Sequence, residues 1–164
     1  MDAGADALSR LPLPVVVIGA AAGAERSCAT TTLTYVSYAP PRVAVPLASG
    51  SRTRALVVES GAFVVSVLAA AQAEVAVLAA SSADGKADDP VFATEDDGAP
   101  SVTGAAAVLR CEVREIVELD SASLVIATVR DARSGDAQPI VRFERRYREL
   151  GAVVNVSEEA AYPL

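Results

Sequence analysis

The chain has 164 residues, of which 52% are hydrophobic and 21% are charged. This length and composition predict one folded domain with a buried core and exclude a mainly disordered chain. The formal net charge of −7 argues against nonspecific binding to nucleic acid or to an anionic membrane surface. Because the chain contains no histidine, zinc, haem and serine–histidine–aspartate sites lack their commonest participant, and no metal site is expected.

The two cysteines indicate a reducing compartment. Cys28 and Cys111 are far apart in the sequence, and there is no Cys-x-x-Cys motif. A disulfide framework is therefore not expected, and a cytoplasmic location is the natural interpretation. The longest apolar stretch, residues 63–80, is interrupted by Gln72 and Glu74, which makes it too polar for a membrane-spanning helix.

The first part of the chain is predicted to contain a lead-in and three strands. Residues 1–12 are small and acidic and are expected to be a flexible lead-in. Residues 15–19 are predicted to form an apolar strand, and residues 27–37 a second strand that is unusually rich in threonine. Pro40 and Pro41 should end that strand, since neither has an amide for the ladder, and residues 42–47 give the third strand.

The remainder is predicted to contain two short helices and four further strands. The helices are expected at residues 52–60, where Gly61 is a natural stop, and at residues 70–80. Residues 81–97 are expected to be a mobile or solvent-covered loop. The strands are expected at residues 63–68, 108–117, 124–129 and 139–143. Many short strands and only two helices predict a mainly β protein built as a small closed or nearly closed barrel.

The threonine-rich strand is the first candidate binding segment. Thr30, Thr31 and Thr32 lie in a strand that carries hydroxyls but no charge. Such a surface offers neutral donors and acceptors, which suit a ligand such as a flavin ring better than a metal ion. The alternative is an ordinary edge strand with solvated hydroxyls, because threonine is a good strand former.

A second candidate segment follows the third strand. Residues 48–54 are predicted to form a small, hydroxyl-rich and basic turn that opens the first helix. Free amides at a helix N-terminus, with hydroxyls and an arginine nearby, favour a phosphate group. The residues predicted to bind it are Ala48, Ser49, Ser51, Thr53 and Arg54. The alternative is a helix N-cap with solvated arginines.

These segments resemble the flavin reductase-like family, the FMN-binding split barrels that serve as reductase components of two-component flavin-dependent monooxygenases. The family pattern of a Ser/Thr-rich strand, a Pro-Pro pair, an apolar strand and a phosphate turn corresponds here to residues 27–37, 40–41, 43–45 and 49–53. Later matches are residues 60–68, 98–100, 109–113 and 143–148. The resemblance covers about residues 13–150 in order, and it implies a mainly β, Greek-key split β-barrel over that range, with a lead-in at 1–12 and a C-terminal tail at 151–164.

The resemblance also implies an NAD(P)H:flavin reductase. FMN or FAD would lie at the barrel surface, usually between two protomers, take hydride at flavin N5 from NADH or NADPH, and leave in reduced form for a partner monooxygenase. Backbone amides of Thr31 and Thr32 would stabilise the negative charge that reduction places near N1, and Arg146 and Tyr147 would lie on the nicotinamide side. No side-chain acid or base is required, so no catalytic residue is assigned. A homodimer is expected, because a small split barrel of this type exposes an apolar sheet face.

The chain departs from the family pattern just before its penultimate long strand. Many members have Gly-Asp-His-Thr there, whereas this chain has Asp120-Ser121-Ala122-Ser123, with Ala122 in place of the histidine. Two alternatives to a reductase therefore stay open. One is a flavin-binding module or carrier without reductase activity, and the other is a structural split barrel that has lost its ligand.

Overall fold

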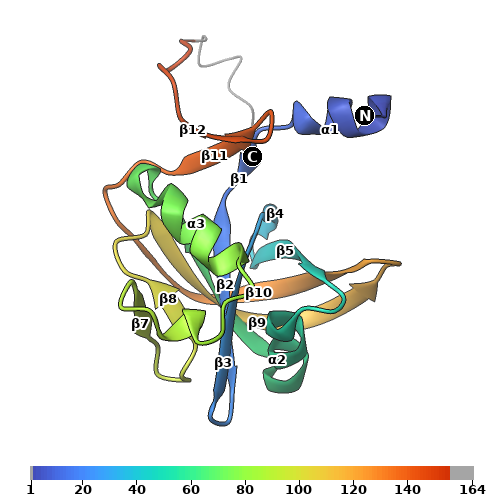
Figure 1. Cartoon of the computed structure of the whole chain (residues 1–164), viewed down its shortest axis with the longest axis vertical. Helices are drawn as coiled ribbons and strands as arrows, with labels where there is room; N and C mark the ends of the chain where they lie inside the picture. Colours follow the sequence, from blue (N-terminus) through green and yellow to red (C-terminus); the bar gives the residue numbers. More distant parts are fainter. Residues whose placement is uncertain (1, 156–164) are drawn as a thin grey trace.

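A seven-stranded antiparallel sheet forms the body of the computed structural model, which describes residues 2–155 (Figure 1). The strand order is β3-β2-β6-β9-β10-β5-β4. The strands are β2 (Val16–Ala22), β3 (Glu25–Thr31), β4 (Thr34–Tyr38), β5 (Pro41–Ala48), β6 (Ala62–Val67), β9 (Ala107–Glu118) and β10 (Ala122–Ser134). The sheet curls until β3 at one edge approaches β5 near the other, where the Thr31 hydroxyl donates to the Pro46 carbonyl over 2.7 Å. The mainly β split barrel predicted from the sequence is confirmed.

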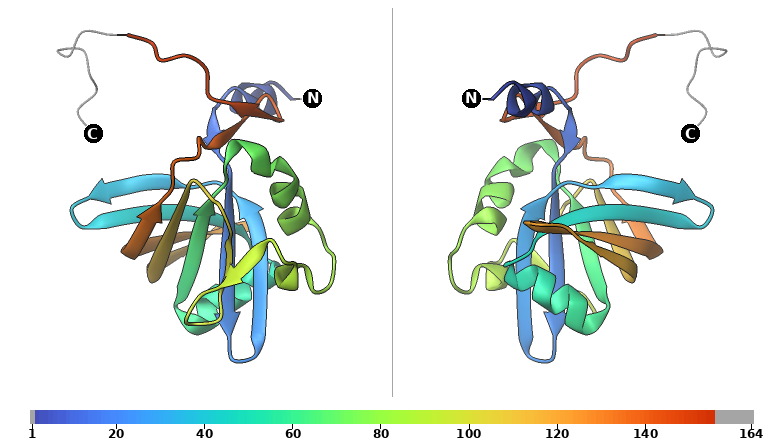
Figure 2. Two further views of the ribbon diagram at one scale, coloured as in Figure 1. Left: turned by 90° about the vertical axis from the view of Figure 1, so that its left-hand side faces the viewer. Right: turned by 90° about the vertical axis from the view of Figure 1, so that its right-hand side faces the viewer.

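Two smaller sheets and three α-helices complete the described residues; α2 and α3 pack on the barrel, whereas α1 lies beside β11 and β12, away from it (Figures 1 and 2). One small sheet contains β1 (Leu13–Pro14), β11 (Ile140–Phe143) and β12 (Arg146–Glu149), and the other contains β7 (Phe92–Thr94) and β8 (Pro100–Val102). The α-helices are α1 (Ala3–Ser9), α2 (Arg52–Ser60) and α3 (Ala73–Ala80), and short 3-10 helices are η1 (Ala70–Gln72) and η2 (Lys86–Asp88). Within residues 2–155, no helix is long and apolar enough to cross a bilayer.

Strand β2 is buried on both of its faces, which explains its nearly unbroken apolar sequence. Val16 and Ile18 point into the barrel, where they pack with Phe63 and with the buried side of α2. Val17 belongs to a second core, which lies under α3 and the β7–β8 hairpin. That second core contains Val15, Cys28, Leu68, Ala76, Ala79, Ala87, Phe92, Val102 and Ile140. The strand therefore fixes both the barrel and the elements that cover its outside.

Gly19 allows a close approach between two strands. A Cβ at this position would lie 1.8 Å from the carbonyl oxygen of Pro100, a distance that no side chain can tolerate. Glycine lets β8 lie directly on β2, so the β7–β8 hairpin packs against the outside of the barrel.

Helix α2 begins and ends at the predicted residues. Ser51 is the N-cap, and its hydroxyl accepts a hydrogen bond from the Arg54 amide over 3.0 Å. Gly61 follows the helix in the left-handed conformation, with φ of 70°, and its amide donates to the Val57 carbonyl. The second predicted helix is present as η1 followed by α3.

Three local details differ from the prediction. The expected lead-in contains α1, because the Asp2 carboxylate caps the amides of Gly4 and Ala5, and residues 2–155 therefore contain three α-helices rather than two. The segment 81–97, expected to be a loop, contains η2 and β7. The threonine-rich segment is two strands, because β3 pairs with β2 while β4 pairs with β5, so the chain crosses between sheet edges at residues 32–33.

Candidate functional site

A cleft with a volume of about 570 Å³ lies between strand β3, the start of α2 and the end of α3. Residues 26–30 form one wall, residues 51–53 form the second, and residues 79–88 form the third. Thr30, Ser51 and Thr53, which came from two separate candidate segments, are therefore brought to one place. The volume lies within the usual range for small-molecule sites.

Hydroxyl contacts join the walls of the cleft to one another. The Ser27 and Thr53 hydroxyls lie 2.9 Å apart, and both residues are buried, so they tie β3 to α2. The Thr30 hydroxyl donates to the Ala76 carbonyl over 2.5 Å and ties β3 to α3. The Ser51 hydroxyl caps α2. The hydroxyls that line the cleft therefore also hold its walls in place.

Cationic side chains outnumber carboxylates in the cleft, although the chain as a whole is acidic. Arg26, Arg52 and Lys86 line it, together with Asp84 and Asp88, and the Asp88 carboxylate lies 3.6 Å from Nε of Arg26. The first-turn amides of Arg52 and Thr53 have no intrahelical carbonyl to bind, and both residues line the cleft, although Thr53 is only 1% exposed. Cations and helix N-terminal amides together favour a phosphate group.

Arg26 and Lys86 also hold the third wall in place. The Arg26 guanidinium donates to the Ala87 carbonyl over 3.0 Å and to the Thr94 hydroxyl over 2.8 Å. The Lys86 ammonium donates to two carbonyls at the C-terminal end of α3, over 2.5 and 2.6 Å. Neither residue was predicted as a site residue, because no nearby motif marks them and only the folded chain brings them to the cleft. The one available signal was that Lys86 is the only lysine in the chain.

Thr31 and Thr32 lie just beyond the cleft, where the chain leaves β3. The Thr31 hydroxyl is bound to the Pro46 carbonyl. The Thr32 hydroxyl is buried and has no hydrogen-bond partner in the described part of the chain. Thr32 also belongs to neither the β2–β3 nor the β4–β5 ladder, so its backbone groups lie outside the sheet pairing. A buried hydroxyl without a partner is costly, and Thr32 is therefore a candidate for contact with a ligand.

The first residues of the predicted phosphate turn face the hairpin between β9 and β10. Ala48 lies opposite Ala122 in the register of β5 and β10. The Ser49 amide donates to the Ser121 carbonyl over 3.1 Å. Neither Ala48 nor Ser49 lines the cleft, although both precede residues that do.

Arg54, predicted to bind the phosphate, is bound to two side chains of the same hairpin. Its Nη2 donates to Oε1 of Glu118 over 2.5 Å, and its Nε donates to the Ser123 hydroxyl over 2.5 Å. Hydrogen bonds from Ser123 and from Arg54 hold the pKa of Glu118 below its ordinary value. The guanidinium is therefore paired with a carboxylate outside the cleft.

Arg146 and Tyr147 are not near the cleft within one chain. Both are exposed on β12, which pairs with β11. Strand β11 contacts η1, just before α3 begins (Figure 1), whereas the α3 residues that line the cleft, Ala79 and Ala80, are at the other end of the helix.

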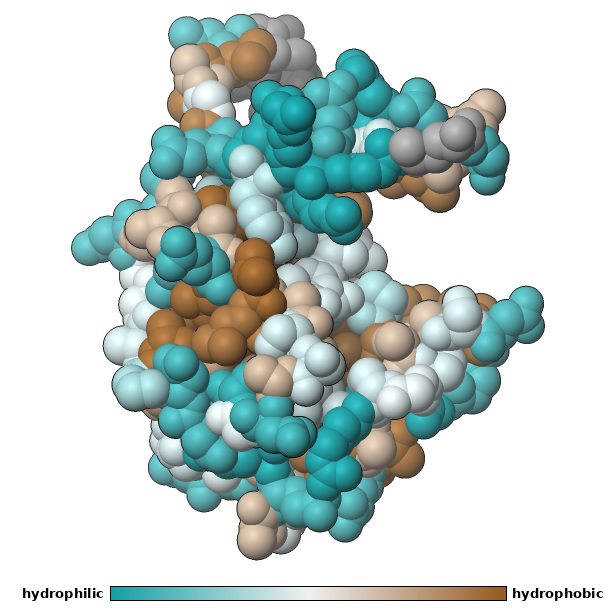
Figure 3. All heavy atoms as spheres, viewed as in Figure 1, coloured by the Kyte–Doolittle hydropathy of each residue, from teal (hydrophilic) through white to brown (hydrophobic). Residues whose placement is uncertain are grey.

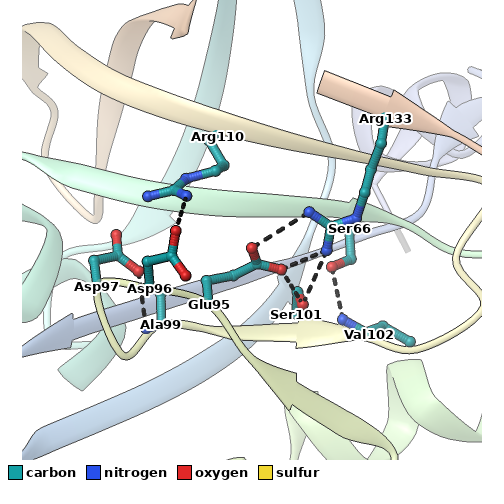
Figure 4. A network of polar contacts seen from close by, with 9 residues as sticks. All are labelled: Ser66, Glu95, Asp96, Asp97, Ala99, Ser101, Val102, Arg110 and Arg133. Carbon is teal, nitrogen blue, oxygen red and sulfur yellow. Dashed lines mark hydrogen bonds and ion pairs between the residues drawn. The ribbon is translucent and has the colours of Figure 1, made fainter. Parts of the chain in front are cut away.

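A second polar network holds the β7–β8 hairpin against the barrel (Figure 4). Glu95 binds Arg133 of β10 through both carboxylate oxygens and accepts a hydrogen bond from the Ser101 hydroxyl over 2.5 Å. The hydrogen bond from Arg133 is the main cause that lowers the pKa of Glu95. Because Arg26 in the cleft binds Thr94 of this hairpin, the network also supports the cleft from outside.

Comparisons with known proteins agree with this architecture. The model of the flavin reductase like domain matches residues 8–151. An NADH:riboflavin 5′-phosphate oxidoreductase of Streptomyces pristinaespiralis is 32% identical over 145 residues, which cover 86% of this chain and 82% of the relative. The reductase component of 4-hydroxyphenylacetate 3-monooxygenase of Thermus thermophilus is 30% identical over 151 residues, which cover 91% of this chain and 96% of the relative.

A solved structure extends the comparison to three dimensions. The styrene monooxygenase flavin reductase of Pseudomonas putida S12 matches with a TM-score of 0.83 and 28% identity, covering 93% of this chain and all of that one. The family match, the two relatives and the shared barrel agree with the resemblance drawn from the sequence motifs. The chain belongs to the flavin reductase-like family.

Proposed function

We propose that this chain is an NAD(P)H-dependent flavin reductase that binds FMN or FAD in the cleft beside β3. The observation that carries the proposal is the meeting of the threonine-rich strand and the predicted phosphate turn in one cleft that three cationic side chains also line. Relatives named NADH:riboflavin 5′-phosphate oxidoreductase and NADPH-flavin oxidoreductase support the reaction and leave both nicotinamide nucleotides within the proposal.

The phosphate end of the flavin fits the wall formed by residues 51–53. The amides of Arg52 and Thr53 are free donors in the first turn of α2, and the Arg52 guanidinium supplies positive charge. Arg52 is exposed and binds Glu25 at the rim, so it can reorient toward a ligand at little cost. Arg26 and Lys86 add positive charge from the other walls.

The ring end of the flavin fits the point where β3 ends. The cleft runs along residues 26–30, and Thr31 and Thr32 continue the chain in that direction. Thr32 has a buried hydroxyl without a partner in residues 2–155 and backbone groups outside both ladders. These are the kinds of neutral donor and acceptor that match the edge of a flavin ring.

The bound flavin would accept hydride from the nicotinamide at N5 and so supply the redox chemistry. The chain's own task is to bind and orient the reactants, and to place donors where negative charge develops. The Thr32 amide is the donor proposed for that charge. Hydride transfer of this kind needs no side-chain acid, so Ala122 in place of a histidine is compatible with the reaction.

We further propose a homodimer in which the β4–β5 hairpin packs on a second copy. This hairpin projects from the barrel (Figure 2). Tyr35, Val36 and Tyr38 are 45%, 48% and 61% exposed on it, and the two tyrosine rings stack with centroids 5.0 Å apart. A projecting arm with exposed aromatic side chains needs a partner surface. In such a dimer, Arg146 and Tyr147 of one copy would be able to reach the cleft of the other copy.

The proposed acceptor of the reduced flavin is a partner monooxygenase. Two relatives are the reductase components of 4-hydroxyphenylacetate 3-monooxygenase and styrene monooxygenase. The cleft opens to solvent and its ring-binding contacts are neutral, which suits a flavin that is released after reduction rather than held permanently.

A cytoplasmic location is proposed from the two cysteines, which are unpaired and buried.

Anaerobic flavin reduction tests the proposal. A catalytic amount of protein should allow NADH or NADPH to bleach the visible absorbance of excess FMN or FAD, and each of the four pairings should be measured. Tight flavin binding without faster bleaching would favour a carrier over a reductase. If neither flavin binds, the barrel is structural and the proposal fails.

A further inference from the structure

Glu118, Arg54 and Ser123 form a closed ring of three hydrogen bonds. Arg54 Nη2 donates to Glu118 Oε1 over 2.5 Å, and Arg54 Nε donates to the Ser123 hydroxyl over 2.5 Å. The Ser123 hydroxyl donates in turn to Glu118 Oε2 over 2.8 Å. Ser123 is fully buried in β10, and Glu118, whose side chain is 57% exposed, is the last residue of β9, so the ring joins α2 to the β9–β10 hairpin.

The ring lies directly behind the wall of the cleft that the flavin phosphate is proposed to contact. Arg54 belongs to the first turn of α2, and its amide donates to the Ser51 hydroxyl that caps this helix. Four residues earlier than Thr53, the Ser49 amide donates to the Ser121 carbonyl of the same hairpin. Hydrogen bonds of Ser49 and Arg54 therefore attach the turn to the hairpin on both sides of Ser51. Arg52 and Thr53 lie between these two attachment points and line the cleft.

The positive charge of Arg54 is already paired with the Glu118 carboxylate inside the ring. Its guanidinium contacts a carboxylate and a buried hydroxyl, and its side chain is 23% exposed. Arg52, two residues earlier, has a side chain that is 59% exposed and lines the cleft. The two arginines of the turn thus have different surroundings, one facing the ligand space and one facing the hairpin.

We infer that Glu118 is a positioning residue for flavin phosphate, acting through Arg54 and Ser123 without touching the ligand. The inference rests on the proposed function, because it concerns the phosphate end of the same cleft. Glu118 holds Arg54 on the hairpin, and Arg54 holds the first turn of α2 in the orientation that aims the amides of Arg52 and Thr53 at the cleft. Orientation of donors fixed before binding is what gives such contacts their strength.

Equilibrium titration of the ligand-free protein with FMN and with riboflavin tests the inference. Glu118→Ala should weaken FMN binding by about tenfold, the size expected from loosening one charge-assisted contact, and should change riboflavin binding by less than about twofold. Glu118→Gln should restore most of the FMN affinity, because its amide oxygen still accepts from Arg54. Glu112→Ala is the matched control, since Glu112 makes an equivalent exposed pair with Arg130 on the same two strands, far from the turn.

A second readout does not depend on flavin. Amide hydrogen exchange at Arg54 and Ala55, whose amides bind the hydroxyl and the carbonyl of Ser51, should be faster in Glu118→Ala than in the wild type, and unchanged in Glu112→Ala. Tighter FMN binding in Glu118→Ala would overturn the inference, because it would mean that Arg54 is itself a phosphate ligand restrained by Glu118. Unchanged FMN binding and exchange in Glu118→Ala would also overturn it. Wild-type protein that binds no flavin would instead overturn the proposed function.

Discussion

The hydroxyls of Ser27 and Thr53 lie 2.9 Å apart in the interior, where they join strand β3 to helix α2. Thr53 is 1% exposed and Ser27 is 8% exposed, so water cannot replace either partner easily. The two residues come from the two segments that the sequence identified separately as binding candidates. Their contact fixes the distance between the proposed ring-binding strand and the proposed phosphate turn.

Thr53→Val should lower the free energy of unfolding by about 1–3 kcal/mol, because the isosteric change leaves the buried Ser27 hydroxyl without its partner. The double variant Ser27→Ala/Thr53→Val should cost less than the sum of the two single changes, since no polar group is then left unsatisfied. Chemical denaturation of the four proteins measures this coupling. Strictly additive losses would show that the hydroxyl pair does not join the two elements.

Arg52→Ala should weaken FMN binding by roughly ten- to a hundredfold and riboflavin binding hardly at all. A charge-assisted contact with phosphate contributes about 1.5–3 kcal/mol, and riboflavin has no phosphate to make it. Fluorescence titration with both ligands measures the difference. Arg130→Ala is the control, because Arg130 is also exposed and paired with a carboxylate but lies away from the cleft. Equal weakening of both ligands would place Arg52 at the ring rather than the phosphate.

Glu95 should make stability depend on pH in the acidic range. Its pKa in the folded protein is lowered, mainly by the hydrogen bond from Arg133, so folding favours the ionised form. The stabilisation is present above the ordinary glutamate pKa of about 4.3 and is lost as the pH falls through the lower folded value. Glu95→Gln should cost about 1 kcal/mol at neutral pH, since Arg133 is half exposed, and should lose this part of the acid dependence.

Urea denaturation of wild-type and Glu95→Gln proteins from neutral pH down to about pH 3 measures the Glu95 effect. The two stability curves should converge toward the acid end. Curves that stay parallel would mean that the Glu95–Arg133 contact contributes no ionisation-linked stability.

The two cysteines should be inert in the folded protein. Cys28 is 1% exposed and Cys111 is 4% exposed, and burial raises the pKa of Cys28 and raises that of Cys111 to about 12. Since the thiolate is the reactive form, a thiol reagent should modify neither residue until denaturant is added. Rapid modification of Cys28 in native protein, prevented by FMN, would instead show that the Cys28 thiol becomes accessible from the cleft.

Local signals in the sequence were enough to predict most of the barrel. The start and end of α2 follow from Ser51 as a cap and Gly61 as a left-handed stop, which act within a few residues. Strand β9 was predicted to within one residue at each end, whereas β10 was predicted too short, mainly because residues 131–134 are exposed and pair only with β9.

Features that depend on distant partners could not be predicted. Glu118 lies 64 residues from Arg54, so the sequence could not show that this arginine already has a carboxylate partner. The division of the threonine-rich segment at Thr32 depends on which sheet edge each half joins. Lys86 reaches the cleft only because the segment after α3 folds back toward β3.

Hydrophobic side chains gather over α3 on the face of the molecule shown in Figure 3, and two exposed positions of this helix differ in whether they line the cleft. Ala80, at the end of α3, is exposed and lines the cleft. Val77 is on the same helix and 61% exposed, but it does not line the cleft. Tryptophan at position 80 would occupy ligand space, whereas tryptophan at position 77 would project from the surface.

The rate of anaerobic flavin reduction in Ala80→Trp, compared with Val77→Trp and the wild type, tests most directly whether flavin is reduced in this cleft. We expect Ala80→Trp to be slower by at least roughly tenfold, about 1.4 kcal/mol in the activation free energy, while Val77→Trp keeps the wild-type rate. Melting temperatures of both variants should match the wild type, because neither residue is in the core. Equal reduction rates in all three folded proteins would contradict the assignment of the cleft as the flavin site.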